Sequence, residues 1–123
     1  MSPGCELVNV HVGREGADYT LVHVEGELDA WTTPECEGRL FSYCEESCGP
    51  VVVDLSSVGF IDSTGVRMLL QLIARNRPHR QIVLVEPERP GPRRALRLLG
   101  MDRVCPLVAS VEEAVAAPTH LTD

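Results

Sequence analysis

The chain has 123 residues and a formal net charge of −7, from 11 basic and 18 acidic side chains. Hydrophobic residues make up 44% of it and charged residues 24%, a composition typical of a globular protein with one core. The acidic balance argues against direct binding of nucleic acid, because phosphate backbones are bound by clustered cations. No apolar run approaches the roughly 20 residues that span a bilayer, and the N-terminus lacks a signal-peptide core. We therefore expect a cytoplasmic protein without membrane contact.

The first expected elements are the two strands of a β-hairpin. Side chains alternate between apolar and polar over residues 6–12 and 19–24, with a glycine-containing turn at 13–16. A loop is expected at 25–29. Thr33 before Pro34 predicts an N-cap and the first position of a helix that runs to about Ser47, where Gly49-Pro50 follows.

An interior strand and a long helix are predicted next. The continuous apolar run 51–53 is typical of a strand covered on both faces, and Asp54 is expected to mark its end. After a connector over 55–61, the segment 64–76 has apolar residues at helical spacing: Val66, Leu69, Leu70 and Ile73. These four are predicted to face the core. The same helical phase places Arg67, Met68 and Gln71 on the exposed face, as a candidate partner-binding stripe.

The remaining sequence predicts two more strands, at 81–85 and near 104–108, and two more helices. One helix begins at Pro90 and ends by Gly100, with its arginines on a solvated face. The other follows a Ser110–Glu113 capping box and ends near Ala117. Strands that alternate with helices predict an α/β fold: one domain over 1–123, with a mixed, mostly parallel sheet, an N-terminal hairpin and about four helices. Its core is expected at about 5–117, with a frayed tail at 118–123.

Five cysteines are an odd number, so disulfide pairing cannot use all of them. Cys36, Cys44 and Cys48 lack both a C-x-x-C pair and a nearby histidine, so structural zinc is the weaker interpretation. We expect reduced, partly buried thiols and no metal or cofactor.

The polar cluster Asp62-Ser63-Thr64-Gly65 stands at the start of the second predicted helix. Helix N-termini present free N–H groups and the positive end of the helix dipole, so this cluster could be a cap or a phosphate site. A serine hydrolase is disfavoured, because Ile61 replaces the first glycine of G-x-S-x-G and no histidine is expected near Ser63. The histidines are His11, His23, His79 and His120. A phospho-accepting Asp54 would need an acidic pair and a lysine, and the chain has no lysine.

The run from Val52 to Val66 resembles the signature of the STAS domain, in particular of bacterial anti-sigma factor antagonists. The resemblance extends to residues 26–29, 33–34, 98–104 and 110–114, and so covers nearly the whole chain. Trp31 and the cysteines of the first helix are not features of this family.

The resemblance implies a non-enzymatic switch in transcription regulation. An anti-sigma factor with serine kinase activity would phosphorylate Ser63, a PP2C-type phosphatase would remove the phosphate, and only the unphosphorylated form would bind the anti-sigma factor and release a sigma factor. Asp29, Asp62, Thr64 and Gly65 would surround the switch. The oligomeric state implied is a monomer or weak dimer. Related alternatives are a STAS scaffold or a nucleotide-binding module without a sigma-factor partner.

Overall fold

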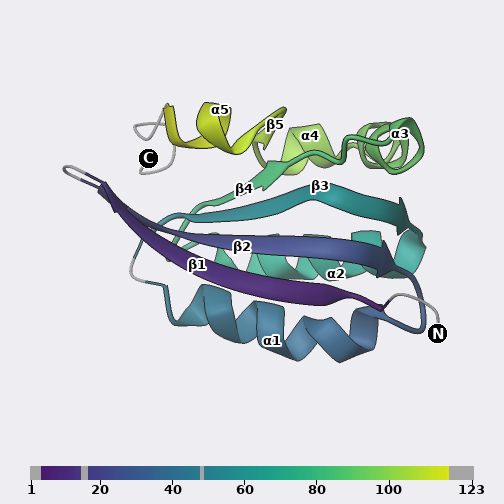
Figure 1. Ribbon diagram of the computed structural model, residues 1–123, viewed down its shortest axis with the longest axis horizontal. Coiled ribbons are helices and arrows are strands. Elements are labelled where there is room, and N and C mark those ends of the chain that lie inside the picture. Colours follow the sequence, from purple (N-terminus) through teal and green to yellow (C-terminus); the bar gives the residue numbers. More distant parts are fainter. Residues whose placement is uncertain (1–3, 15–16, 48, 117–123) are drawn as a thin grey trace.

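The computed structural model describes residues 4–14, 17–47 and 49–116. One mixed sheet has the strand order β1-β2-β3-β4-β5, in which β1 and β2 are antiparallel and all other neighbours are parallel (Figure 1). The single α/β domain with a hairpin and a mostly parallel sheet is therefore confirmed. The elements in chain order are β1 (Glu6–Arg14), β2 (Ala17–Leu28), α1 (Thr33–Glu45), β3 (Val51–Ile61), α2 (Ser63–Asn76), β4 (Ile82–Val85), α3 (Pro90–Leu98), α4 (Met101–Val104), β5 (Leu107–Val108) and α5 (Val111–Ala116).

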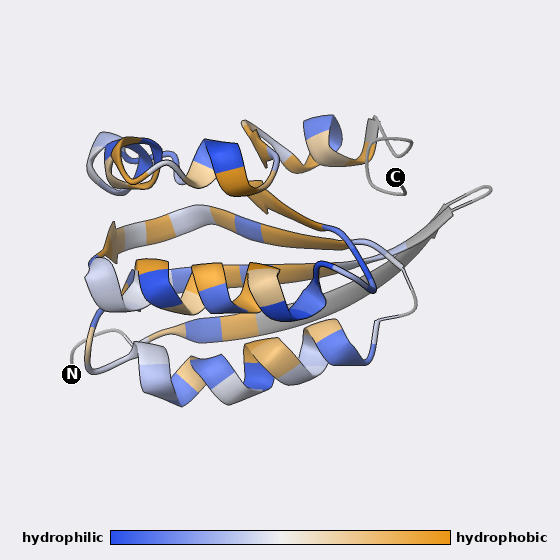
Figure 2. Cartoon of the chain, turned by 180° about the vertical axis from the view of Figure 1, so that it is seen from behind, coloured by the Kyte–Doolittle hydropathy of each residue, from blue (hydrophilic) through white to orange (hydrophobic). Residues whose placement is uncertain are grey.

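The sheet is packed on both faces, because alternate residues of its central strands point to opposite sides. Val51 and Val53 join a large core with α1 and α2, to which Leu96 and Met101 add α3 and α4. Val52 belongs to a smaller cluster on the opposite face, which α5 covers. Strands β3 and β4 are accordingly apolar along much of their length (Figure 2).

Two strands are longer than predicted. The expected loop at 25–29 continues β2 as far as Leu28, and β3 does not stop at Asp54 but runs on to Ile61. The polar pair Ser56-Ser57 concealed this extension, yet Val58 and Ile61 are buried against the helices and pair with β2. The β2–β3 register shifts twice, and at Gly26, with φ of 100°, a Cβ would overlap the Gly4 carbonyl oxygen. Irregular pairing thus carries both strands to the edge where α2 begins.

The predicted phase of α2 is wrong in one respect that bears on function. Met68 is 1% exposed and lies in the core, whereas Leu70, predicted to be buried, is 38% exposed. Leu72 is buried as well, so the buried arc is wider than the predicted stripe. The cause is that α2 packs against α1 and α4 as well as against the sheet. Met68 therefore cannot serve as an exposed contact for a partner.

Smaller differences concern the ends of elements. Helix α1 begins at Thr33 rather than Pro34, with Thr32 at the N-cap and no side-chain cap bond. The strand expected near 104–108 is only Leu107–Val108, because Met101–Val104 forms a one-turn helix, which makes five helices among the described residues. The Ser110 cap is confirmed: Glu113 N donates to Ser110 Oγ at 3.0 Å. The tail predicted at 118–123 lies outside the described residues.

The described cysteines are free thiols, and Cys36, Cys44 and Cys105 are buried, as expected. Burial raises the pKa of Cys44 and that of Cys105 to about 12. The thiols of Cys5 and Cys36 hydrogen-bond to each other, which raises the pKa of Cys5 and lowers that of Cys36. Cys48 lies outside the described residues. Within the described ranges, no helix is long and apolar enough to cross a membrane.

The phase of α2 gives a stability test. Met68→Ala should lower the free energy of unfolding by about 2–5 kcal/mol, because it leaves a cavity in the core. Leu70→Ala, at a partly exposed position on the same helix, should cost less than about 1 kcal/mol. Chemical denaturation of both variants measures the difference. Equal losses, or a larger loss at Leu70, would contradict the observed phase.

Candidate functional site

Ser63 is the first residue of α2, and its side chain is exposed. The helix cap is supplied by its neighbour: Asp62 Oδ1 accepts from Thr64 N at 2.8 Å and from Gly65 N at 3.3 Å. The capping role considered for either residue therefore belongs to Asp62. No hydrogen bond found among the described residues uses the Ser63 hydroxyl, which leaves it available at the surface.

Gly65 fixes the start of α2 against the end of β2. A Cβ at this position would lie 2.7 Å from the Leu28 carbonyl oxygen and 2.8 Å from Ile61 Cγ1, which is too close for any other residue without a shift of backbone. Asp62 N also donates to the Leu28 carbonyl at 3.1 Å. The backbone on both sides of Ser63 is therefore held against the end of β2.

The loop between β2 and α1 is held by Asp29. Its Oδ1 accepts from the backbone N–H of Trp31 and that of Thr32, both at 2.9 Å, and from Thr32 Oγ1 at 3.0 Å. Hydrogen bonds from Thr32 and Trp31 lower the pKa of the Asp29 carboxyl. Thr32 Oγ1 also contacts the Glu27 carbonyl. The loop is thus ordered by local bonds, although the Trp31 side chain is 86% exposed.

The other predicted site residues are divided between surface and core. Arg67 and Gln71 are exposed on α2, Thr64 is half-buried, and Gly65 and Met68 are buried. Sequence reasoning missed Trp31 as a feature of this region. The sequence does contain a signal for its exposure. Trp31 lies in the turn Asp29–Thr32 and has no apolar residue at strand spacing with which it could share a buried face.

The described histidines lie away from Ser63. His23 Nδ1 is 3.0 Å from Asp54 Oδ2, between the neighbouring strands β2 and β3. Asp54 is 8% exposed and also accepts from Ser56 N at 3.0 Å. It lies inside β3 and not at the end of a strand, which removes the positional basis for a phospho-accepting Asp54.

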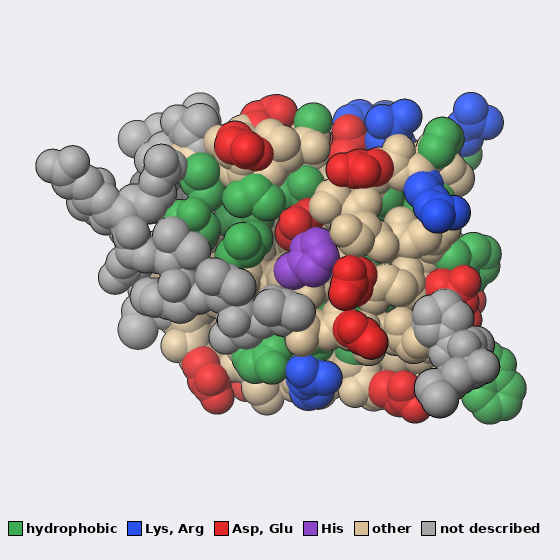
Figure 3. Space-filling model, in the orientation of Figure 1, with side chains coloured by type: hydrophobic (Ala, Val, Ile, Leu, Met, Phe, Trp, Pro, Cys, Tyr) green, Lys and Arg blue, Asp and Glu red, His purple; other side chains and the backbone are tan. Residues whose placement is uncertain are grey.

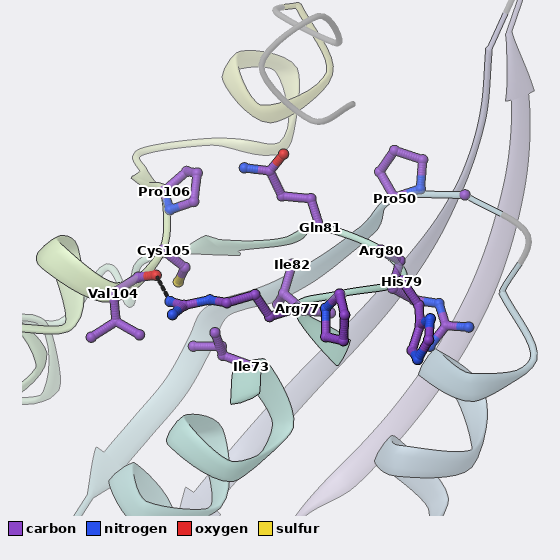
Figure 4. Close-up of a pocket in the computed structure, with 12 residues that line it drawn as sticks. Pro50, Ile73, Arg77, His79, Arg80, Gln81, Ile82, Val104, Cys105 and Pro106 are labelled. Atoms are coloured by element: carbon purple, nitrogen blue, oxygen red, sulfur yellow. Dashed lines mark hydrogen bonds between the residues drawn. The ribbon is translucent and has the colours of Figure 1, made fainter. Parts of the chain in front are cut away.

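A hollow of about 430 Å³ lies at the opposite edge of the sheet, where β4 begins and α2 has ended (Figure 4). Arg77, His79 and Arg80 line it, and Arg77 Nη2 donates to the Val104 carbonyl at 3.0 Å. Ser63 stands instead on an open surface at the carboxyl ends of the parallel strands. Among the residues that the structure describes, no three His, Cys, Asp or Glu side chains converge to hold a metal ion. An exposed hydroxyl on a rigid support suits a protein partner better than a small substrate.

The single tryptophan reports directly on the Asp29 turn. Since the pKa of Asp29 is lowered from its ordinary value of 3.8, its hold on the loop is complete above that value and is lost as pH falls through the lowered pKa. Trp31 fluorescence anisotropy should stay constant from about pH 7 to about pH 5 and decrease only below the ordinary pKa of an aspartate. Asp29→Ala should show the decreased anisotropy already at neutral pH. A transition above about pH 5, or an unchanged variant, would contradict this role; circular dichroism controls for unfolding.

Comparisons with known proteins agree with this fold. The family model "STAS domain" matches residues 11–114. An anti-sigma factor antagonist from Mycobacterium paratuberculosis superposes with a TM-score of 0.73 at 26% identity, covering 93% of this chain and 95% of that one. SpoIIAA in its unphosphorylated form gives a TM-score of 0.70 at 18% identity, covering 96% of this chain and 100% of that one, a likeness of fold.

Among curated proteins, the anti-sigma-B factor antagonist of Staphylococcus epidermidis is 40% identical over 53 residues. The match covers 43% of this chain and spans about half, 49%, of that relative. With a family model that matches most of its length and a fold of the same architecture, the chain belongs to the STAS domain family.

Proposed function

We propose that this protein is an anti-sigma factor antagonist switched by phosphorylation of Ser63. In the unphosphorylated form it binds a cytoplasmic anti-sigma factor that is also a serine kinase, and a sigma factor is released. The phosphorylated form does not bind, and a PP2C-type phosphatase restores the active form. The protein acts by binding and not as an enzyme.

The observation that carries this proposal is the position of Ser63. It is an exposed hydroxyl on the first turn of α2, directly after the carboxylate that caps the helix. A kinase can reach such a hydroxyl without unfolding the domain. The same side chain lies on an open surface that a protein partner can cover, so one added group changes the partner's contact surface.

The helix start also tolerates a phosphate. Negative charge is favoured near a helix N-terminus by the dipole. Arg67 is exposed one turn later on α2, at the i+4 spacing that brings side chains together on a helix. It can pair with a phosphate on Ser63 and offset the repulsion from Asp62. The modification should therefore leave the fold intact and act on binding.

The relatives support the same assignment. The Mycobacterium paratuberculosis protein, at 26% identity, and the Staphylococcus epidermidis protein, at 40% over its matched segment, are both named as antagonists of an anti-sigma factor. The Bacillus cell fate determinant SpoIIAA, which shares the fold at a TM-score of 0.63 and 19% identity, has been solved in a phosphorylated form. These names favour an antagonist over a STAS scaffold or a nucleotide-binding module.

Phosphate mapping tests the proposal. Serine-kinase anti-sigma factors from the genome that encodes this chain are incubated with it and Mg-ATP, and phosphopeptides are identified by mass spectrometry. One kinase should add a single phosphate on Ser63, and Ser63→Ala should receive none. Thr64→Ala is the matched control and should still be phosphorylated, since Ser63 is intact. Phosphate on Thr64 or Ser57, or none from any such kinase, would overturn the assignment.

A further inference from the structure

Exposed large apolar side chains gather at one end of the domain. Single exposed apolar residues are ordinary on protein surfaces, so their grouping is the informative feature. Of the five found among the described residues, only Leu70 lies midway along α2. The other four belong to the β2–α1 loop, the end of β3, and the end of α3, and are Trp31 at 86%, Phe60 at 47%, Leu98 at 78% and Leu99 at 60% exposed.

These segments lie at the end of the molecule where α2 starts. In Figure 1 the β2–α1 loop is at the lower right, α3 is at the upper right, and the start of α2 lies between them. Figure 2, seen from behind, keeps the same order from bottom to top. Arg89, at the start of α3, lies near the end of β3: its Nε is 3.9 Å from where a Gly59 Cβ would be. In both views the start of α2, of which Ser63 is the first residue, therefore lies between the β2–α1 loop and α3.

Trp31 has the properties of an anchor for a partner. Tryptophan is enriched among the residues that dominate binding energy at protein interfaces. The hydrogen bonds of the Asp29 turn hold its backbone, with Trp31 N donating to Asp29 Oδ1 at 2.9 Å. A side chain presented by an ordered loop loses less conformational entropy on binding than one on a flexible loop.

Helix α3 adds positive charge to this end of an acidic protein. Residues 89–99 contain four arginines and no acidic side chain, although the chain as a whole carries −7. Arg97 is neutralised by Glu86 at 2.9 Å, but the ion pairs found among the described residues include none with Arg89, Arg93 or Arg94. A shallow hollow of about 330 Å³ between Arg93, Arg94 and Leu98 can receive an apolar side chain. In Figure 3 the basic side chains gather at the upper right, where α3 lies, while acidic ones lie across the sheet face and also lower down at this end.

We infer that the anti-sigma factor docks across this end of the domain, anchored by Trp31 on one side of Ser63 and by Leu98 and Leu99 on the other, and that it presents an acidic surface to α3. This docking face rests on the proposed function and names the partner's chemistry. The partner then covers Ser63, and a phosphate there adds about −1.5 to −2 charge between two anchors. That negative charge repels the acidic surface of the partner and so opposes the attraction that the arginines provide.

The charge distribution favours an acidic protein over other occupants. Helix α3 has nine residues, and its exposed Leu98 together with Leu99 just after it offers little apolar surface to a lipid bilayer. The net charge of −7 also repels anionic lipid. Arginine and aromatic side chains together are the composition enriched in protein–protein interfaces. A second copy of the chain would have to bring the same arginine-bearing surface of α3 against itself.

The experiment measures binding of the kinase that phosphorylates Ser63 to unphosphorylated variants of the full chain, by calorimetry and by kinetics at two salt concentrations. Trp31→Ala and the double variant Leu98→Ala/Leu99→Ala should each weaken binding at least tenfold, and Trp31→Phe should retain part of the affinity. Arg93→Glu/Arg94→Glu should slow association, and the remaining rate should depend less on salt. All four change exposed positions, so melting temperatures should stay near that of the unchanged chain.

Two controls match these changes away from the docking face. Leu70→Ala removes an exposed leucine midway along α2, and Arg77→Glu reverses a charge at the opposite end of that helix. Both should bind as the unchanged chain does. If Ser63→Asp weakens binding while the Trp31 and leucine variants bind normally, the docking face is wrong and the proposed function stands. If no kinase phosphorylates Ser63, both fail. Normal binding by the arginine variant overturns the acidic partner surface.

Two further results would also overturn the docking face. When the chain is sedimented with vesicles of equal parts phosphatidylglycerol and phosphatidylcholine, it should stay in the supernatant. If it pellets with the vesicles and the Leu98→Ala/Leu99→Ala variant does not, the occupant of this face is a membrane. Analytical ultracentrifugation of the unchanged chain should show no dimer that depends on Trp31. A dimer that is lost in the Trp31→Ala variant would identify a second copy of the chain as the occupant.

Discussion

The close contact between the start of α2 and the end of β2 determines where Ser63 lies. Gly65 allows the helix backbone to approach the Leu28 carbonyl to a distance at which any side chain would clash. The same carbonyl accepts from Asp62 N, and the Asp62 side chain then caps the helix. Without this contact the helix would start farther from the sheet, and the serine would lose its fixed position beside the Asp29 turn.

The two edges of the parallel sheet differ in the side chains that they carry. At the amino ends of the strands, Arg77 and Arg80 bind backbone carbonyls at the ends of helices and form the walls of a hollow. At the carboxyl ends, short connections bring three turns together and leave aromatic, leucine and arginine side chains exposed. Such a surface is suited to large contact areas with another protein. Ser63 lies at this edge and not in the hollow, so under the proposed function a phosphate on it would face a partner.

The alternation of strands and helices, with the polar cluster at 62–65, was sufficient to predict the fold class and the helix that begins at Ser63. The length of β3 could not be predicted, because Ser56 and Ser57 interrupt its apolar pattern while neighbouring β2 continues to pair with it. The phase of α2 also could not be fixed. Val66, Leu69 and Ile73 belong to two overlapping apolar stripes, one with Leu70 and one with Met68, and only packing against α1 and α4 decides between them. Exposure of Trp31 likewise depends on a turn held by side-chain hydrogen bonds.

Under the proposed function, phosphorylation of Ser63 acts locally, through charge at a preformed surface, and not by changing the fold. Calorimetric melting of the unmodified and Ser63-phosphorylated domains, with titration of each against the kinase partner, tests it most directly. The predicted result is a melting temperature within a few degrees of the unmodified form and at least a tenfold loss of affinity, which corresponds to about 1.4 kcal/mol. A phosphorylated domain that melts far lower, or that binds the partner with unchanged affinity, would contradict a local switch at Ser63.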